Sequence, residues 1–241
     1  MIHLEKKIIY IANPKTGSDA IRGYLQRTPG FQSERQFLDR ERLFEVCMEN
    51  DFPNKSWLCV DDQLEHLPAF LYQAYLRSVH NIDMAEFTVF STVRNPWLKA
   101  ISAFKYSLTN NHGVSSEQVN QDNEVLITLF REYIQHTSAW KGYQYIYPDY
   151  VHLRNYQYMC LGPDDKDLCN QIFDIKETPL IPSYLQTLGV ECLPVIPRTN
   201  TIQKGNPKNR QKFFNDEARR IIYEANIKSI DKFGYTFDEI G

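Results

Sequence analysis

Two short segments of this chain carry residues that could bind phosphate groups. The first begins with the β-rich run Lys7–Ala12, which leads into a turn containing Lys15, Thr16, Gly17 and Ser18. A strand that passes through a tight turn into a helix presents backbone N–H groups to an anion. Gly17 would let the backbone approach the anion closely, Lys15 would add a positive charge, and the hydroxyls would add donors. The pattern predicts a phosphate-binding turn; the alternative is an ordinary turn with a solvated lysine.

The second segment follows the buried strand predicted over Phe87–Thr92. Arg94 comes at the end of this strand, Pro96 suits the first turn of a helix, and Ser102 follows two turns later. Arg94 and Ser102 could converge on one phosphate, to which arginine offers a forked, charge-assisted contact. The alternative is an arginine that caps a strand end and a serine on a helix face.

Charge and pattern narrow the kind of ligand. The Walker pattern GxxxxGK[ST] is absent, since Lys15 precedes Gly17. The formal net charge of −3 argues against a nucleic-acid partner held by bulk electrostatics. An anionic ligand would therefore be held by a few well-placed cations and backbone N–H groups.

The chain length and composition predict one globular domain over residues 1–241, with 42% apolar and 24% charged residues. No apolar run is long enough to span a membrane and no signal peptide is evident, so we expect a cytoplasmic protein. Five cysteines without CxxC spacing favour buried thiols over a zinc site or a disulfide framework, although Cys160 and Cys169 could pair.

Apolar periodicity and capping residues predict the elements that position these segments. Strands are expected over 7–12, 57–60, 87–92 and 171–175. Helices are expected over 19–26, 39–49, 68–79, 96–106, 124–135 and 181–188, with a last helix capped by Asn215 and ended by Gly234. We expect loops over 110–122 and 194–210. Six tyrosines within 143–158 (Tyr143, Tyr145, Tyr147, Tyr150, Tyr156 and Tyr158) offer flat faces that suit sugar rings, or alternatively pack in the core.

Two motifs resemble those of a known family. KKIIYIANPKTGSDAI resembles the 5′-phosphosulfate loop of sulfotransferases that use 3′-phosphoadenosine 5′-phosphosulfate (PAPS), and FTVFSTVRNPWLKAISAF resembles their 3′-phosphate motif. The likeness is to the carbohydrate-type group with its soluble bacterial members. Weaker likenesses lie at His66-Leu67-Pro68-Ala69, at QIFDIKETP with residues 198–200, and in the closing DKFGYTF. The resemblance covers most of the chain except residues 27–56 and 107–150.

The resemblance implies an α/β fold, a three-layer sandwich whose central, mostly parallel sheet has four or five strands, of the P-loop NTPase-like sulfotransferase type. It implies transfer of a sulfuryl group from PAPS, without a metal, to an acceptor hydroxyl, here of a carbohydrate. Lys15 would stabilise the leaving phosphate, and His66 would be the general base, because its usual pKa of about 6.5 suits proton removal near neutral pH. Glu65 is the second candidate base. The residues implied to bind PAPS are Lys15, Thr16, Gly17, Ser18, Arg94 and Ser102.

The chain departs from the family at one point. Where the family has Gly-Thr-Ser, this sequence has Ser18-Asp19-Ala20. Asp19 would suit the first turn of a helix, but if it pointed inward it would repel a phosphosulfate. A sulfotransferase-like binding protein without activity therefore stays open. A phosphate-loop kinase is a second alternative, opposed by the missing Walker pattern and by the lack of a clear acidic motif for Mg²⁺.

Overall fold

The computed structural model describes residues 1–50, 61–121, 123–139, 155–197 and 207–241. The chain forms two compact units that alternate along the sequence. Unit 1 combines Met1–Val93 with Tyr156–Thr199, and unit 2 combines Arg94–Asn155 with Asn200–Gly241. The single domain over 1–241 stays a prediction, because the compactness of two units does not tell whether they fold independently.

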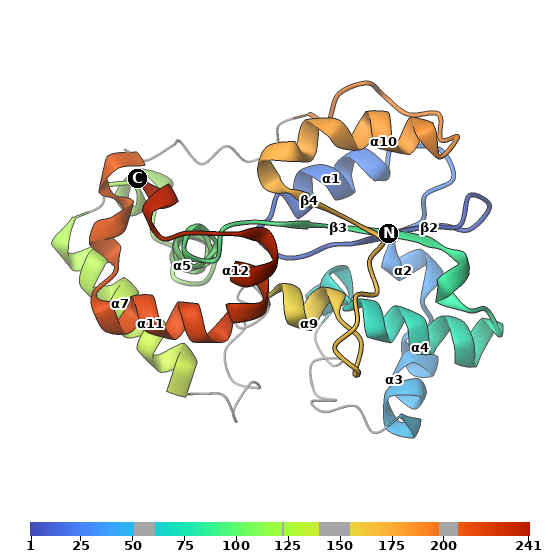
Figure 1. Cartoon of the computed structure of the whole chain (residues 1–241), viewed down its shortest axis with the longest axis horizontal. Coiled ribbons are helices and arrows are strands. Elements are labelled where there is room, and N and C mark those ends of the chain that lie inside the picture. Colours follow the sequence, from blue (N-terminus) through green and yellow to red (C-terminus); the bar gives the residue numbers. More distant parts are fainter. Residues whose placement is uncertain (51–60, 122, 140–154, 198–206) are drawn as a thin grey trace. The chain divides into compact units, whose positions relative to one another are not determined.

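Unit 1 is an α/β structure around a four-stranded mixed sheet (Figure 1). Its strands lie in the order β1 (Ile2–His3), β2 (Ile8–Ile11), β3 (Thr88–Val93) and β4 (Gln171–Asp174). β2 pairs with β3 and β3 with β4 in parallel, whereas β1 is an antiparallel edge strand. The sheet is thus mostly parallel, as predicted, and β1 is an addition that the sequence did not indicate.

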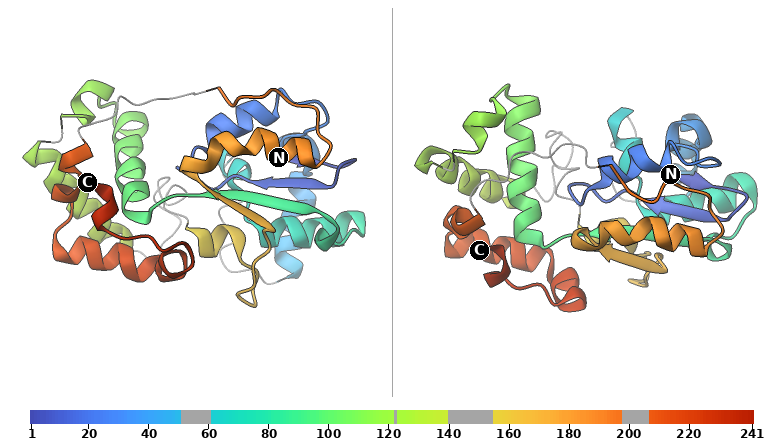
Figure 2. Two further views of the ribbon diagram at one scale, coloured as in Figure 1. Left: turned by 45° about the horizontal axis from the view of Figure 1, so that its top comes forward. Right: turned by 90° about the horizontal axis from the view of Figure 1, so that it is seen from above.

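Helices cover both faces of this sheet, as Figures 1 and 2 show. α1 (Ser18–Leu25) and α10 (Ile181–Thr187) lie on one face, where Tyr10, Phe90 and Phe173 belong to the buried core. The opposite face is covered by α2 (Glu34–Phe37), α4 (Ala69–His80) and α9 (Tyr156–Cys160). Both faces being covered explains why β2 reads as an unbroken apolar run. The remaining described elements of unit 1 are α3 (Arg40–Glu49) and three 3₁₀ helices, η2 (Asp61–His66), η3 (Met84–Glu86) and η4 (Ile175–Leu180).

Unit 2 is helical and packs around aromatic side chains. Phe130 lies at its centre, with ring centroids 5.5 Å from Phe104, 5.4 Å from Phe213 and 4.9 Å from Phe214, all in edge-to-face arrangements. Such aromatic pairs stabilise the core beyond what the burial of their apolar surface alone contributes. The described elements are α5 (Pro96–Asn111), α6 (Ser116–Val119), α7 (Glu124–Ala139), η5 (Pro207–Phe213), α11 (Asp216–Ala225), α12 (Ile227–Phe233) and η6 (Asp238–Ile240).

The closing segment of the chain holds the start of α5. The Asn95 side chain caps α5 by accepting hydrogen bonds from the backbone N–H groups of Trp97 and Leu98, and its amide donates to the Thr236 carbonyl at 3.0 Å. The Trp97 ring meets Phe237 edge-on at 5.6 Å. These contacts give the Asn-Pro-Trp motif and the terminal Gly-Tyr-Thr-Phe run a shared structural role.

Some sequence predictions of local structure were wrong. The loop expected over 110–122 begins with the last turn of α5 and contains α6, whose first turn has a capping box between Ser115 and Gln118. The last helix breaks at Asn226 into α11 and α12, although its predicted ends are confirmed: Asn215 accepts from the Ala218 N–H, and Gly234 has a φ of +65°. The strand expected over 57–60 lies outside the described residues, as do residues 198–206.

Two expectations concerned membranes and thiols. Within the described ranges, no helix combines the length and the apolar character needed to cross a bilayer. Cys160 and Cys169 are both buried in unit 1 as thiols, with no disulfide between them.

Candidate functional site

The turn between β2 and α1 has the backbone geometry of an anion-binding loop. Lys15 has a φ of +60° and Gly17 a φ of +83°, while Thr16 between them keeps a negative φ. Alternation of φ between the two signs turns successive N–H groups toward the same side, which forms a concave site for an anion. A Cβ on Gly17 would meet Ile175 at 3.6 Å, an ordinary contact, so glycine is favoured here by its backbone conformation and not by space.

The N–H groups of Thr16, Gly17 and Ser18 lie where this turn enters α1. Among the described residues, no backbone carbonyl accepts a hydrogen bond from the N–H of Thr16, Gly17 or Ser18. The first N–H groups of a helix lack partners inside the helix, and the helix dipole favours negative charge there. The half-buried Lys15 adds a cation to the same turn. Asp19 lies exposed in the first turn of α1, where a carboxylate is locally favourable.

A chain of hydroxyl groups fixes the turn from beneath. Thr16 Oγ1 lies 2.7 Å from the Asn13 carbonyl oxygen, which can only accept, so the Thr16 proton is used there. Thr16 Oγ1 must then accept from Thr92 Oγ1, also at 2.7 Å. Thr92 in turn accepts from the Tyr10 hydroxyl at 3.2 Å. Burial raises the pKa of Tyr10, which keeps its phenol protonated as the first donor.

The hydrogen bonds of these hydroxyl groups correct the prediction that the Thr16 hydroxyl is a donor to the ligand. The Thr16 side chain is fully buried, and its hydroxyl faces the sheet instead of supplying a donor to a ligand. The Thr16 hydroxyl is therefore not a donor to an anion bound at the turn. A second bond, from the Asn13 amide to the Thr92 carbonyl at 3.0 Å, ties the same turn to the end of β3.

His66 is hydrogen-bonded to Ala12, the first residue after β2. It ends η2, is 8% exposed, and its Nδ1 lies 2.7 Å from the Ala12 carbonyl oxygen. Because a carbonyl oxygen only accepts, Nδ1 carries the proton of the neutral ring, which leaves the lone pair on Nε2. This tautomer is the one that a general base working through Nε2 requires. The structure therefore brings His66 and the Lys15–Ser18 turn together in unit 1.

The neighbouring Glu65 is committed to an ion pair. Its carboxylate binds the guanidinium of Arg22, a buried residue of α1, and Arg35 lies 3.9 Å away. Burial raises the pKa of Glu65, but the hydrogen bond and charge of Arg22, helped by Arg35, outweigh it and lower the pKa overall. A carboxylate with a lowered pKa is a weak base, so Glu65 is a poorer candidate than His66.

Arg22 also contacts a second, buried carboxylate. Its guanidinium lies 3.6 Å from Glu34, which further accepts a hydrogen bond from the Tyr72 hydroxyl at 2.9 Å and contacts the α-amino group of Met1. One arginine of α1 thus joins the helix that follows the anion turn to α2 and to the segment bearing His66. Sequence analysis missed Arg22, because these carboxylates lie far from it along the chain.

The second predicted phosphate motif belongs to unit 2. Arg94 directly follows β3 and Ser102 lies on α5, and both side chains are half-buried. Asn95, the residue after Arg94, caps the helix. Of the tyrosine stretch, residues 143–150 lie outside the described residues. Tyr156 is buried in α9, and the Tyr158 ring meets Phe70 of α4 edge-on, so both pack within unit 1.

Comparison with known proteins gives no further assignment: no family model, curated protein or solved structure matches this chain. Across the part of the chain that the structure describes, no group of three or more His, Cys, Asp and Glu side chains is placed to hold a metal ion. The functional interpretation therefore depends on the geometry of the turn and its neighbours.

Thr92→Val and Tyr10→Phe should not be additive. Thr92→Val leaves the buried Tyr10 hydroxyl without its acceptor, which costs about 1–3 kcal/mol of unfolding free energy. In a Tyr10→Phe background that hydroxyl is already gone, so the same substitution should cost less. Denaturant unfolding of the four proteins measures the coupling. As a control, Ser91→Ala, which removes a bond to the Ile11 carbonyl, should add independently to Tyr10→Phe. Additive Thr92 and Tyr10 effects would contradict the hydroxyl chain.

The Arg22–Glu65 pair should make stability depend on pH in the acidic range. Because folding lowers the Glu65 pKa, the unfolded state takes up its proton first as the pH falls. The stabilisation is complete above the unfolded pKa, near 4.3, and disappears as the pH drops through the folded pKa. Unfolding free energies of the wild type and Glu65→Gln should thus differ at pH 7 and converge in acid. Glu86→Gln, at the exposed Lys7–Glu86 pair, is the control and should show little difference at either pH. A gap that persists in acid contradicts the ion-pair explanation.

Proposed function

We propose that this protein is a sulfotransferase that moves a sulfuryl group from PAPS to an acceptor hydroxyl. The observation that carries the proposal is the turn at Lys15–Ser18, where positive φ values at Lys15 and Gly17 lead into α1 and the His66 ring is hydrogen-bonded to the Ala12 carbonyl just before the turn. The likeness of both phosphate motifs to those of PAPS-dependent enzymes supports it. A P-loop-like sulfotransferase fold, a carbohydrate acceptor and a cytoplasmic location are parts of the same proposal.

The proposed reaction is an in-line displacement at sulfur. The acceptor oxygen forms a bond to sulfur while the bond between sulfur and the 5′-phosphate oxygen breaks. The acceptor proton moves to Nε2 of His66, and the leaving group is adenosine 3′,5′-bisphosphate. The transition state is loose, as in phosphoryl transfer, so stabilising the leaving phosphate matters most. Lys15 and the N–H groups of Gly17 and Ser18 would do this.

The 3′-phosphate is proposed to bind Arg94 and Ser102. An arginine offers a planar fork of donors to phosphate, and the serine hydroxyl adds a further donor. The exposed position of Asp19 in the first turn of α1 favours a role as a helix-terminal acid over repulsion of the ligand. This weakens the case for an inactive family member, although turnover alone decides between the two.

The nucleotide should be recognised at both ends. Adenosine 3′,5′-bisphosphate should raise the melting temperature more than ATP or AMP does, since a ligand selective for the folded state stabilises it. Arg94→Ala should weaken binding of the bisphosphate by about 1.5–3 kcal/mol and leave binding of 5′-AMP nearly unchanged. Lys15→Ala should weaken both nucleotides. Titration calorimetry measures all of these affinities.

Arg77→Ala is the matched control, because it removes an exposed arginine of unit 1 at no proposed site. Equal loss of both nucleotides in Arg94→Ala would contradict its assignment to the 3′-phosphate. Stabilisation by ATP equal to that by the bisphosphate would point to a kinase.

His66 should affect turnover without affecting the nucleotide. A screen of PAPS against saccharide, phenolic and aliphatic alcohols, read by mass gain, first identifies an acceptor. His66→Ala should then lower kcat roughly 10²–10⁴-fold, the usual contribution of a general base. His66→Asn keeps a side-chain donor for the Ala12 carbonyl, so it separates loss of the base from loss of that contact. Nucleotide affinity should be retained in both variants.

His80→Ala, at the exposed end of α4, serves as the control for histidine removal. Normal turnover in His66→Asn would overturn the assignment of His66 as the base. Bisphosphate binding with no transfer to any acceptor would identify a binding protein instead.

A further inference from the structure

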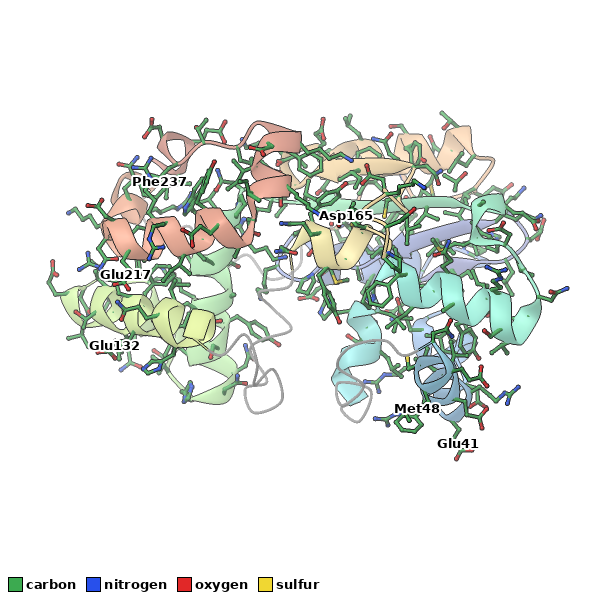
Figure 3. The ribbon with its side chains drawn as sticks, turned by 60° about the horizontal axis from the view of Figure 1, so that its bottom comes forward. Glu41, Met48, Glu132, Asp165, Glu217 and Phe237 are labelled. Carbon is green, nitrogen blue, oxygen red and sulfur yellow. The ribbon has the colours of Figure 1, made fainter. Side chains whose placement is uncertain are left out.

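Unit 2 contains a pocket that the proposed sulfuryl transfer does not use. It has a volume of about 410 Å³, within the range of roughly 300–1,000 Å³ usual for small-molecule sites. The pocket is lined by residues of α11, by the closing segment that carries Phe237, and by Trp97 of α5. Figure 3 marks Phe237 on that closing segment, beside α11.

Aromatic rings give the pocket an apolar lining. Trp97 is almost fully buried, and its indole N–H donates to the Arg219 carbonyl at 3.3 Å, so its polar group is satisfied inside the protein. Phe237 packs edge-on against Trp97, and Tyr223 on α11 remains 42% exposed. A ligand would therefore meet aromatic ring surface on one part of the pocket.

Charges of both signs line the same pocket but do not neutralise one another. Asp216 stands three and four residues before Arg219 and Arg220 on α11, the spacing at which side chains of opposite charge normally pair. Instead, the Arg219 guanidinium lies over the Phe237 ring at 4.5 Å, and Arg220 pairs with Glu224 at 2.9 Å. The ion pairs of the described residues include neither Asp216 nor Asp238.

The charged side chains of the pocket limit which charges a ligand can carry. Two carboxylates oppose a strongly anionic ligand such as a nucleotide bisphosphate, and the Arg219 guanidinium, which has no carboxylate partner among the described ion pairs, opposes a simple cation. A zwitterion matches both sets. Its ammonium can bind Asp216 or Asp238, its carboxylate can accept from the Arg219 fork, and an apolar chain between them can cover the rings.

We propose that this pocket binds a small zwitterion in which methylene groups separate an ammonium from a carboxylate, as in an ω-amino acid. The proposal does not depend on sulfuryl transfer and would stand if the protein had no such activity. Because the charged groups of the pocket are exposed, binding is weak and falls as the salt concentration rises.

The test uses 6-aminohexanoate, with hexanoate and hexylamine as ligands that each lack one charge. Saturation-transfer NMR at low salt gives the three dissociation constants. 6-Aminohexanoate should bind roughly fivefold or more tightly than either singly charged analogue. Equal binding of all three ligands would contradict the proposal.

Variants assign each charge to its partner. Arg219→Gln should weaken 6-aminohexanoate and hexanoate but not hexylamine, because it removes the carboxylate partner. Asp216→Asn combined with Asp238→Asn should weaken 6-aminohexanoate and hexylamine but not hexanoate. All three residues are exposed, so the variants should fold, which their melting temperatures check.

Arg77→Gln and Asp231→Asn are the matched controls, since both change exposed charges outside the pocket. They should leave all three affinities unchanged. If the pocket variants behave like these controls, the ligand binds elsewhere and the proposal is wrong. If lactose binds and is lost in the pocket variants while 6-aminohexanoate does not bind, the pocket takes a neutral polyol and the zwitterion is excluded.

Discussion

The parallel pairing of β2 with β3 is the constraint on which the candidate site depends. The register pairs Tyr10 with Phe90 and Ile11 with Ser91, so Thr92 lies level with the chain as it leaves β2. Its hydroxyl can then meet both Tyr10 and Thr16. A slip of one residue would turn Thr92 to the opposite face of the sheet and break the chain of hydroxyls. The left-handed conformations at Lys15 and Gly17 are maintained by this buried support.

Buried charge gives the same region its second constraint. Arg22 and Glu34 are both buried, and a buried charge is costly unless it is paired with good geometry. In the described structure Arg22 lies within ion-pair distance of both Glu34 and Glu65, which brings the two carboxylates close to α1. His66, next to Glu65, is thereby held where its Nδ1 reaches the Ala12 carbonyl. The ion pair thus positions His66 and at the same time lowers the basicity of Glu65.

Unit 2 depends on a different kind of contact. Its aromatic rings join α5, α7 and η5, and Phe237 extends the cluster by packing on Phe214 and Trp97. The bond from Asn95 to the Thr236 carbonyl connects the residue after Arg94 to a segment more than a hundred residues later. The same closing segment forms a wall of the pocket proposed to bind a zwitterion. A substitution at Phe237 would therefore disturb packing and pocket together.

The sequence by itself determined what is local. The strand at 8–11, the cap at Asn215 and the start of α5 at Pro96 follow from the properties of neighbouring residues, and all three were predicted. The Ser115 and Gln118 capping box was also readable in principle, but the absence of periodicity around it hid α6.

Only the tertiary structure decided which distant side chains meet. Three features depend on contacts between segments that are remote in the sequence. The Thr16 hydroxyl faces inward, Glu65 pairs with Arg22, and Arg219 lies over Phe237 instead of pairing with Asp216. Composition and periodicity carry no information about such pairings, because they describe one segment at a time. Where a polar group is buried, its partner is set by the packing of the whole unit. The residue types of the candidate site could thus be predicted from the sequence, whereas their protonation, orientation and hydrogen-bond partners were decided by the fold.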